Sequence, residues 1–189
     1  MRKTQTYNFT LVLRGVSEST EGLEDAIFSA GCDDALINFR EGAVYLDFDR
    51  EAKSIEEAVL TAIQDVTSTP LNITVVSVAP DLFVSESGIA KRLNKTRQAV
   101  SHWIKGNRRS QIPFPNPVMK LEEKSPLWRW YDVTQWLYQQ KQITDPDIVA
   151  NARFFEAING AILEQDQVTK DECHKLSKKL GLINKKRVA

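Results

Sequence analysis

Residues 84–106, VSESGIAKRLNKTRQAVSHWIKG, decide how the rest of the chain is interpreted, because they predict two short helices joined by a tight turn. Ser85 and Thr96 are suited to cap the first and second helix, since their side-chain oxygens accept hydrogen bonds from free backbone amides. Asn94 tolerates a positive φ and is expected to end the first helix, and Gly106 is expected to end the second. Two helices joined in this way form a helix-turn-helix.

Each of these helices has an apolar side at helical spacing. Ile89, Ala90 and Leu93 form it in the first helix, and Val100 and Trp103 close the core from the second. The opposite side of the second helix carries side chains suited to base edges and phosphates, namely Arg97, Gln98, Ser101, His102 and Lys105. The alternative is an ordinary helical hairpin with a solvated polar face, but the turn, both caps and the core spacing favour a DNA-binding unit.

The chain has no net charge, but its charges are segregated along the 189 residues. Residues 1–83 contain 6 basic and 14 acidic residues, a net charge of −8. Residues 84–110 contain 7 basic residues and 1 acidic residue, a net charge of +6, and residues 111–189 contain 12 and 10, a net charge of +2. Local positive charge is what phosphate contacts need, so the acidic N-terminal part is expected to face away from DNA.

The first 80 residues predict a separate domain in a chain of the α+β class. Residues 17–20 offer caps for its first helix, and Ser54 with Glu57 predicts a capping box for its second. The paired acids Asp33 and Asp34 are interpreted as solvated loop residues. Dimerisation, partner contact and effector sensing all stay open for this domain. The expected order is the ferredoxin-like β-α-β-β-α-β, with strands at residues 7–13, 35–39, 43–48 and 73–78 and helices at 23–30 and 55–66.

Residues 81–142 are expected to complete a winged helix-turn-helix domain. Residues 114–121 and 127–130 predict short extended segments around a polar loop, and their prolines suit irregular or edge strands. Asp132 is expected to cap the helix that follows. Three tryptophans are interpreted as core residues that pack the wing onto the helices, with base stacking as the alternative: Trp128, Trp130 and Trp136.

Residues 85–137, with FPNPV, PLWRW and DVTQWL after the helix-turn-helix, resemble the winged helices of the MerR and phage-excisionase (AlpA-like) superfamily. They are similar to a group of small bacterial helix-turn-helix proteins with a wing motif of the form FPxPV…LWRW…DVxxWL. The preceding segment, with FTLVLRG, AGCDDA and FDREA, is similar to the N-terminal half of members of that group. The resemblance therefore covers residues 7–138.

The resemblance implies sequence-specific binding of double-stranded DNA, with the second helix in the major groove and the wing along the backbone or minor groove. Glu122 and Glu123 depart from this pattern, because negative charge at the wing tip disfavours deep insertion. The sequence gives no sign of the effector-binding helix of MerR-type sensors. The implied contacts are Arg97, Gln98, Ser101 and His102 at base edges, Thr96, Lys105, Arg108 and Arg109 near phosphates, Ser85 at a phosphate, and Lys124 and Arg129 in the wing.

Residues 143–189 predict a helical extension with a basic tail. Asp145 followed by Pro146 is a helix start, and Thr169 with Glu172 predicts a second capping box. The apolar side of these helices needs a partner, either another part of the chain or a second copy, and a dimer contact is favoured. Residues 184–189 are expected to be a frayed tail.

The expected function is transcriptional regulation by a homodimer or higher homo-oligomer, as a repressor that can include its own operon among its targets. Two other classes stay open. One is an antitoxin-type protein that grips a partner protein through the acidic domain or the C-terminal helices while it represses its operon. The other is an excisionase-like factor that bends DNA for recombination.

An enzyme is the least expected class. The histidines are His102 and His174, no phosphate-binding loop is present, and no nucleophile has a plausible base nearby in sequence. No cofactor or metal is expected. Because the sequence lacks a signal peptide and a long apolar run, and Cys32 and Cys173 lie far apart, we expect a cytoplasmic protein that joins the nucleoid when bound to DNA.

Overall fold

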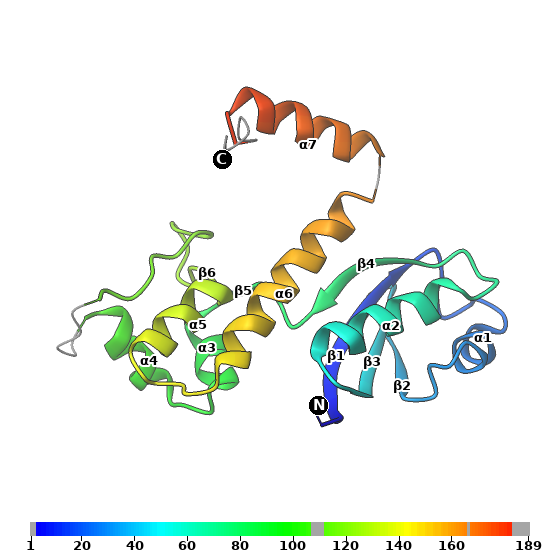
Figure 1. Ribbon diagram of the computed structural model, residues 1–189, viewed down its shortest axis with the longest axis horizontal. Helices are drawn as coiled ribbons and strands as arrows, with labels where there is room; N and C mark the ends of the chain where they lie inside the picture. Colours follow the sequence, from blue (N-terminus) through cyan, green and yellow to red (C-terminus); the bar gives the residue numbers. More distant parts are fainter. Residues whose placement is uncertain (1–2, 107–111, 166, 183–189) are drawn as a thin grey trace.

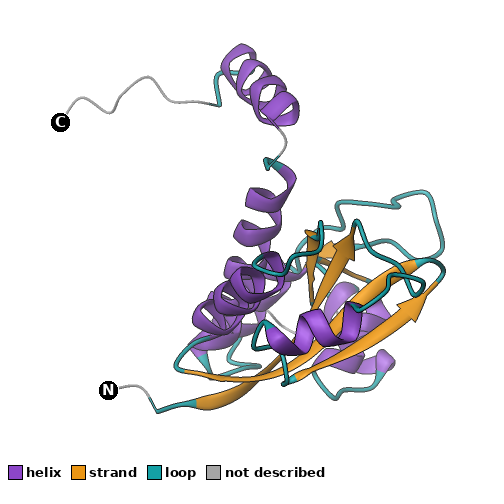
Figure 2. Cartoon of the chain, turned by 90° about the vertical axis from the view of Figure 1, so that its right-hand side faces the viewer, coloured by secondary structure: helices purple, strands orange, loops and turns teal. Residues whose placement is uncertain are grey.

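The computed structural model describes residues 3–106, 112–165 and 167–182 (Figure 1). Within these ranges the chain is a mixed α+β protein, as the sequence predicts. It has two lobes, each with its own hydrophobic core. The long helix α6 (Pro146–Leu163) lies between the lobes, and the last helix, α7 (Gln167–Lys179), stands off both of them (Figures 1 and 2).

The first lobe is built on a four-stranded antiparallel sheet, and its two central strands bury every second residue along the core. Phe9 and Leu11 of one central strand and Leu46 and Phe48 of the other all point into one core. The strands lie in the order β2-β3-β1-β4, where β1 is Gln5–Arg14, β2 is Ala35–Arg40, β3 is Ala43–Ala52 and β4 is Thr74–Ala79. The predicted order of elements is completed by two helices on this core, α1 (Leu23–Ser29) and α2 (Ile55–Thr67).

The sequence of this lobe predicts a hairpin turn at Glu41 and Gly42 as well as the cap at Ser54, and both are present. Glu41 and Gly42 form the turn between β2 and β3 with φ of 51° and 81°. Positive φ at both central residues gives a two-residue hairpin turn the twist that matches its strands. The hydroxyl of Ser54 caps α2 by accepting a hydrogen bond from the Glu57 amide at 3.1 Å. These two signals place β3 and α2 in the chain.

The start of α1 differs from the prediction. Residues 17–20 are wrong as helix caps, because α1 begins only at Leu23. The Ser17 amide donates to the Thr20 hydroxyl at 2.9 Å, so these polar side chains close a turn before the helix. Gly22 occupies the N-cap position with φ of 71° and makes no side-chain cap.

Arg50 is a buried charge on the inner side of β3, the same side as Leu46 and Phe48. Its guanidinium donates to Asp34 at 2.8 and 3.0 Å and to Asp65 at 2.7 Å, and it lies over the Phe48 ring. Burial lowers its pKa, but hydrogen bonds to the two carboxylates outweigh burial and raise the pKa above its ordinary value. Asp34 is therefore wrong as a solvated loop residue, because it ties the loop before β2 to β3.

Replacing Arg50 with methionine should lower the free energy of unfolding by about 3 kcal/mol, because two carboxylates lose their buried partner. The loss stays near the low end of the usual range, since the side chains of Asp34 and Asp65 are 27% and 35% exposed and regain water. Urea unfolding followed by circular dichroism measures the change. Arg40→Met on the exposed side of β2 is the matched control, expected within about 0.5 kcal/mol of the wild type. Equal losses in both variants would contradict a specific role for Arg50.

The two cysteines should react very differently. Burial raises the pKa of the Cys32 thiol to about 11, whereas Cys173 is exposed on α7. At pH 8 only about one Cys32 in a thousand is then a thiolate, the reactive form. A chromogenic disulfide reagent should titrate one thiol per chain in dilute native protein and the second only in denaturant. Cys173→Ser should remove the fast reaction, and two fast thiols in the wild type would contradict the burial of Cys32.

The second lobe packs three helices and a two-stranded sheet around aromatic side chains. The Trp103 and Trp136 ring centroids lie 5.9 Å apart, and the Phe114 ring lies 4.9 Å from Trp136. Asp132 is wrong as the cap of the third helix of this lobe, because that helix begins at Trp130 and Asp132 lies in its first turn. The elements are β5 (Phe83–Val84), α3 (Glu86–Arg92), α4 (Arg97–Ile104), β6 (Trp128–Arg129) and α5 (Trp130–Gln139), with β5 and β6 antiparallel.

Helix α6 belongs to the core of the first lobe, which corrects the expectation of a dimer contact on its apolar side. Phe155 and Ile162 are buried in that core. The Asn159 side-chain amide accepts from the Val78 amide at 2.9 Å and donates to the Val78 carbonyl at 2.8 Å, so it pairs with the edge strand β4. The predicted start of α6 is confirmed, because Asp145 accepts a hydrogen bond from the Asp147 amide at 2.9 Å.

Helix α7 begins at Gln167, so Thr169 lies inside it and is wrong as its cap. The predicted tail, residues 184–189, lies outside the described residues. None of the helices in the described ranges has the length and apolarity needed to cross a bilayer.

Candidate nucleic-acid interface

The turn between α3 and α4 is closed by the interactions that the sequence predicts. Ser85 and Thr96 each accept a hydrogen bond at 3.2 Å from the amide three residues later, so each caps its helix. Asn94 has φ of 49°. The Lys95 amide donates to the Ala90 carbonyl at 2.9 Å, and the Asn94 amide donates to the Lys91 carbonyl at 3.2 Å. This pair of bonds is a Schellman motif, which fixes the direction in which α4 leaves the turn.

The buried side of α4 fixes which of its residues face solvent. Val100 is fully buried and Trp103 is 4% exposed, where it packs on Trp136 of α5. Ala90 of α3 is also buried, and its small side chain allows the two helices to lie close. The predicted contact residues on the opposite side of α4 are exposed, namely Arg97, Gln98, His102 and Lys105. Ser101 is half-buried.

Among the described residues, Arg97 forms an ion pair with the carboxylate of Glu86 on α3, at 3.4 Å. The Arg97 side chain is 68% exposed. Exposed ion pairs contribute about 0–1 kcal/mol, so this partner is easily exchanged for a phosphate or a base edge. Arg97 is therefore both positioned by Glu86 and available to a ligand.

Two basic residues near the turn were not predicted as contacts. Lys91 on α3 and Lys95 after it are both exposed, on the same part of the lobe as the start of α4. The sequence signal for them was their place in the segment of net charge +6. Arg92 lies in the same segment but is withdrawn from the surface: it donates to the Asp81 carbonyl at 2.8 Å and lies over the Trp130 ring. Burial lowers the pKa of Arg92.

The predicted wing consists of two paired extended segments that are held against α5. The Val118 amide donates to the Leu127 carbonyl at 2.8 Å, which pairs the two extended segments. Trp128 donates to the Pro115 carbonyl and Trp136 to the Ile112 carbonyl, each at 3.0 Å from the indole nitrogen. Trp128 and Trp136 are thus buried core residues, as predicted, and Trp130 is half-buried.

The charged side chains of the wing differ in where they lie. Lys124 is exposed at the tip, together with Glu122 and Glu123. Arg129 faces α6 instead, where it donates to the Glu156 carboxylate at 2.9 Å and pairs with Asp132 at 3.8 Å. The hydrogen bond to Glu156 raises the pKa of Arg129. The structure therefore does not bring Arg129 together with the α4 residues, and Arg108 and Arg109 lie outside the described residues.

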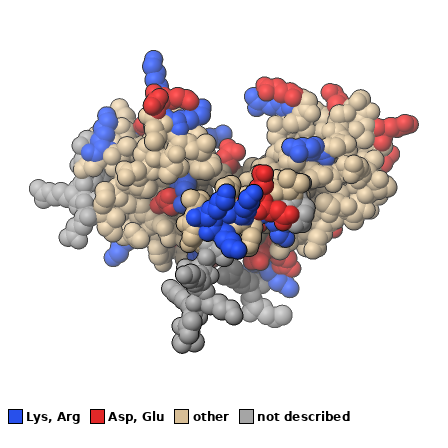
Figure 3. All heavy atoms as spheres, turned by 90° about the horizontal axis from the view of Figure 1, so that it is seen from above, with Lys and Arg blue, Asp and Glu red and all other residues tan. Residues whose placement is uncertain are grey.

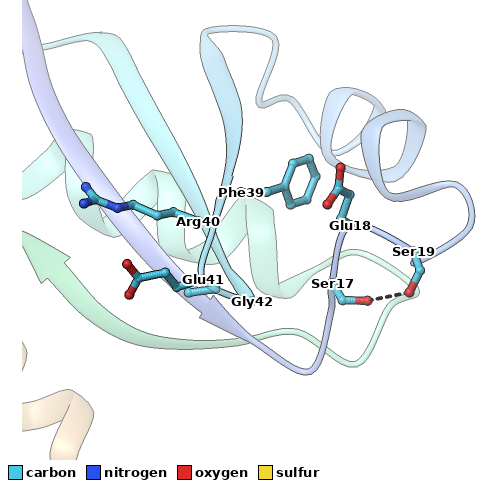
Figure 4. Close-up of a pocket in the computed structure, with 8 residues that line it drawn as sticks. Ser17, Glu18, Ser19, Phe39, Arg40, Glu41 and Gly42 are labelled. Carbon is cyan, nitrogen blue, oxygen red and sulfur yellow. Dashed lines mark hydrogen bonds between the residues drawn. The ribbon is translucent and has the colours of Figure 1, made fainter.

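The hollows of the first lobe lie apart from these residues. One open hollow of about 540 Å³ lies between the loop after β1 and the turn between β2 and β3 (Figure 4). Phe39 and Glu18 line one part of it, whereas Arg40 and Glu41 point away from Phe39. Among the described residues no group of histidine, cysteine and acidic side chains is placed to hold a metal ion. The exposed side of α4 is thus the stronger candidate site.

The chain matches no protein-family model, no curated protein and no solved structure.

Substitutions at Asn94 test the backbone conformation of the turn between α3 and α4. Asn94→Val should lower the free energy of unfolding by about 1–2 kcal/mol, because a β-branched residue is strained at positive φ. Asn94→Gly should stay within about 0.5 kcal/mol, since glycine adopts this conformation freely. Lys95→Val, next to it but without positive φ, is the control for adding a valine to this surface. Thermal unfolding compares the three, and a glycine variant as unstable as the valine variant would contradict the assignment.

Proposed function

We propose that the chain is a sequence-specific double-stranded DNA-binding protein that regulates transcription, with repression as its mode of action. In this proposal the second lobe is a winged helix-turn-helix of the MerR and excisionase kind, and the first lobe is a ferredoxin-like domain. The observation that carries the proposal is the exposed polar side of α4, which lies opposite a fully buried apolar side. A rigid helix that presents donors and acceptors in this way suits the major groove.

The chemistry of α4 divides into base-edge and phosphate contacts. Arg97 and Gln98, at the start of the helix, have the bidentate donor and acceptor geometry that reads guanine and adenine. His102 lies one turn further along the same side. Lys95 and Lys105 flank the helix at its two ends, where single positive charges suit phosphates. Lys91 adds a further positive charge on α3.

The wing supports a contact along the backbone rather than deep insertion in a groove. Its tip carries Glu122 and Glu123, and Lys120 is paired with Glu123 at 3.2 Å. Lys124 adds a further positive charge at the tip, and it forms no ion pair with any residue that the structure describes. Two carboxylates at the tip would be repelled by the phosphates that line a narrow groove. Specificity is thus assigned to α4.

The acidic first lobe is proposed to face away from DNA and to carry contacts with protein. On the open side of its sheet, Asp47 accepts hydrogen bonds from Thr10 at 2.6 Å and Asn38 at 2.9 Å, and Asp49 accepts one from Asn8. This ordered polar face favours the second candidate, an antitoxin-type protein that binds a partner here while α4 binds DNA. A stable partner that co-purifies with the wild type and is lost on Asp47→Lys would support that candidate, and retention of the partner would oppose it.

Replacing Arg97 and Gln98 together with alanine should abolish the preference for a selected DNA site over a scrambled one. Each bidentate contact contributes about 1–3 kcal/mol of discrimination, so loss of both should lower the ratio of the two affinities by about 30-fold or more. Gel-shift titration with both duplexes measures it. Arg153→Ala with Gln139→Ala, an exposed arginine and glutamine on α6 and α5, is the matched control and should keep the wild-type ratio. Unchanged specificity in the α4 variant would show that the orientation of α4 is wrong.

Lys105→Ala should behave differently from the α4 double variant. Loss of one phosphate contact weakens binding to all sequences alike and reduces the slope of log affinity against log salt by about 1. Titrations at several salt concentrations measure this slope, and a loss of specificity with an unchanged slope would contradict the phosphate assignment.

A further inference from the structure

Helix α7 has an apolar stripe that the described part of the chain leaves uncovered. Leu176 and Leu180, the latter directly after the last residue of the helix, are 55% and 70% exposed, and Cys173 is exposed as well. Neither of the two hydrophobic cores formed by the described residues includes a residue of α7. Figures 1 and 2 both show the helix standing off the two lobes. Its apolar side is therefore open to a partner.

The stripe has the spacing of a coiled-coil seam. Thr169, Cys173, Leu176 and Leu180 are separated by four, three and four residues, which is the d-a-d-a spacing of a heptad repeat. Such a seam packs against a second helix of matching pattern. A helix of 13 residues is also marginal in water when nothing packs against it, so a partner helix would stabilise α7.

The charges beside the seam attract those of a second copy only when the two helices run antiparallel. Glu172 directly precedes Cys173 and Lys179 directly precedes Leu180, so both occupy g positions of successive heptads. In an antiparallel pair, g positions face g positions. Aligning Cys173 of each copy with Leu176 of the other then brings Glu172 of one copy beside Lys179 of the other, at both ends of the contact.

A parallel pair lacks this complementarity. There g positions face e positions, and Glu172 would meet Ser177, which carries no charge. Of the other charges of α7, Lys175 and Lys178 lie in its C-terminal half and Asp171 lies in its N-terminal half, which agrees with the antiparallel arrangement, whereas Lys170 in the N-terminal half is an exception. Figure 3, seen from the side of α7, shows basic side chains gathered beside acidic ones in the centre of the view.

We propose that α7 pairs antiparallel with α7 of a second copy of the chain, through a seam of Cys173, Leu176 and Leu180 and with two Glu172–Lys179 ion pairs. The proposal does not rest on DNA binding and is tested without DNA. The contact is small, so dissociation into single chains at low micromolar concentration is expected. When two copies are joined in this way, the two-fold axis of the dimer passes between the two α7 helices. This symmetry matches a DNA site with two half-sites.

Sedimentation velocity of the full chain at low salt, over a range of concentrations, tests the pairing by charge reversal. Glu172→Lys and Lys179→Glu each place like charges together at both ends and should raise the dimer Kd by about tenfold. The double variant Glu172→Lys with Lys179→Glu restores opposite charges and should bring the Kd back to within about threefold of the wild type. Recovery in the double variant is specific to an antiparallel contact, because in a parallel pair these residues do not meet.

Two controls complete the experiment. Lys175→Glu makes the same charge change on the side of α7 away from the seam and should leave the Kd unchanged. Leu176→Ser should make the chain monomeric, while near-ultraviolet circular dichroism of the two lobes stays that of the wild type. A wild type that is monomeric up to 100-fold above the concentrations used for DNA binding would overturn the proposal, as would a double variant no better than the single ones.

Discussion

The aromatic packing between α4 and α5 is the interaction on which the candidate site depends. Trp103 of α4 lies against Trp136 of α5, and Phe114 also lies against Trp136. The indole nitrogens of Trp128 and Trp136 donate to the backbone carbonyls of Pro115 and Ile112, which holds the start of the wing in place. Because this packing buries one side of α4 completely, the helix cannot rotate without exposing it. The polar side of α4 is therefore held outward as a rigid surface, which is what recognition of a groove requires.

Helix α6 joins this surface to the first lobe. Asn159 pairs with the backbone of β4, and Phe155 and Ile162 enter the core of the sheet. On the other side of α6, Glu156 holds Arg129 of β6. One helix thus makes specific polar bonds to both lobes and fixes how they are placed relative to each other.

The sequence predicts those features that depend on neighbouring residues. The Ser85 and Thr96 caps, the positive φ of Asn94 and the buried side of α4 follow from spacing alone, and all are present. Hairpin and capping signals likewise placed β3 and α2. The start of α1 was missed because Ser17 and Thr20 use their hydroxyls to close a turn of their own, a common competitor of helix caps.

Features that depend on distant residues could not be predicted in the same way. Arg50 meets Asp34 and Asp65 only when three elements have packed, although its place on the inner side of β3 was a usable signal. Arg92 is one of the basic residues of the segment 84–110, but it is half-buried, donates to the Asp81 carbonyl and lies over the Trp130 ring. Arg129 was assigned to the wing, and its partner Glu156 lies 27 residues away on α6. In each case a positive charge is held by contacts that no local pattern specifies.

DNA recognition through α4 is tested most directly by selecting bound duplexes from random and genomic DNA with the purified chain. A discrete site should be enriched by the wild type, whereas the chain with alanine at Arg97 and Gln98 should enrich no site while it keeps the fold. Enrichment of the same site by that variant, or no enrichment by the wild type at low salt, would contradict DNA recognition through α4.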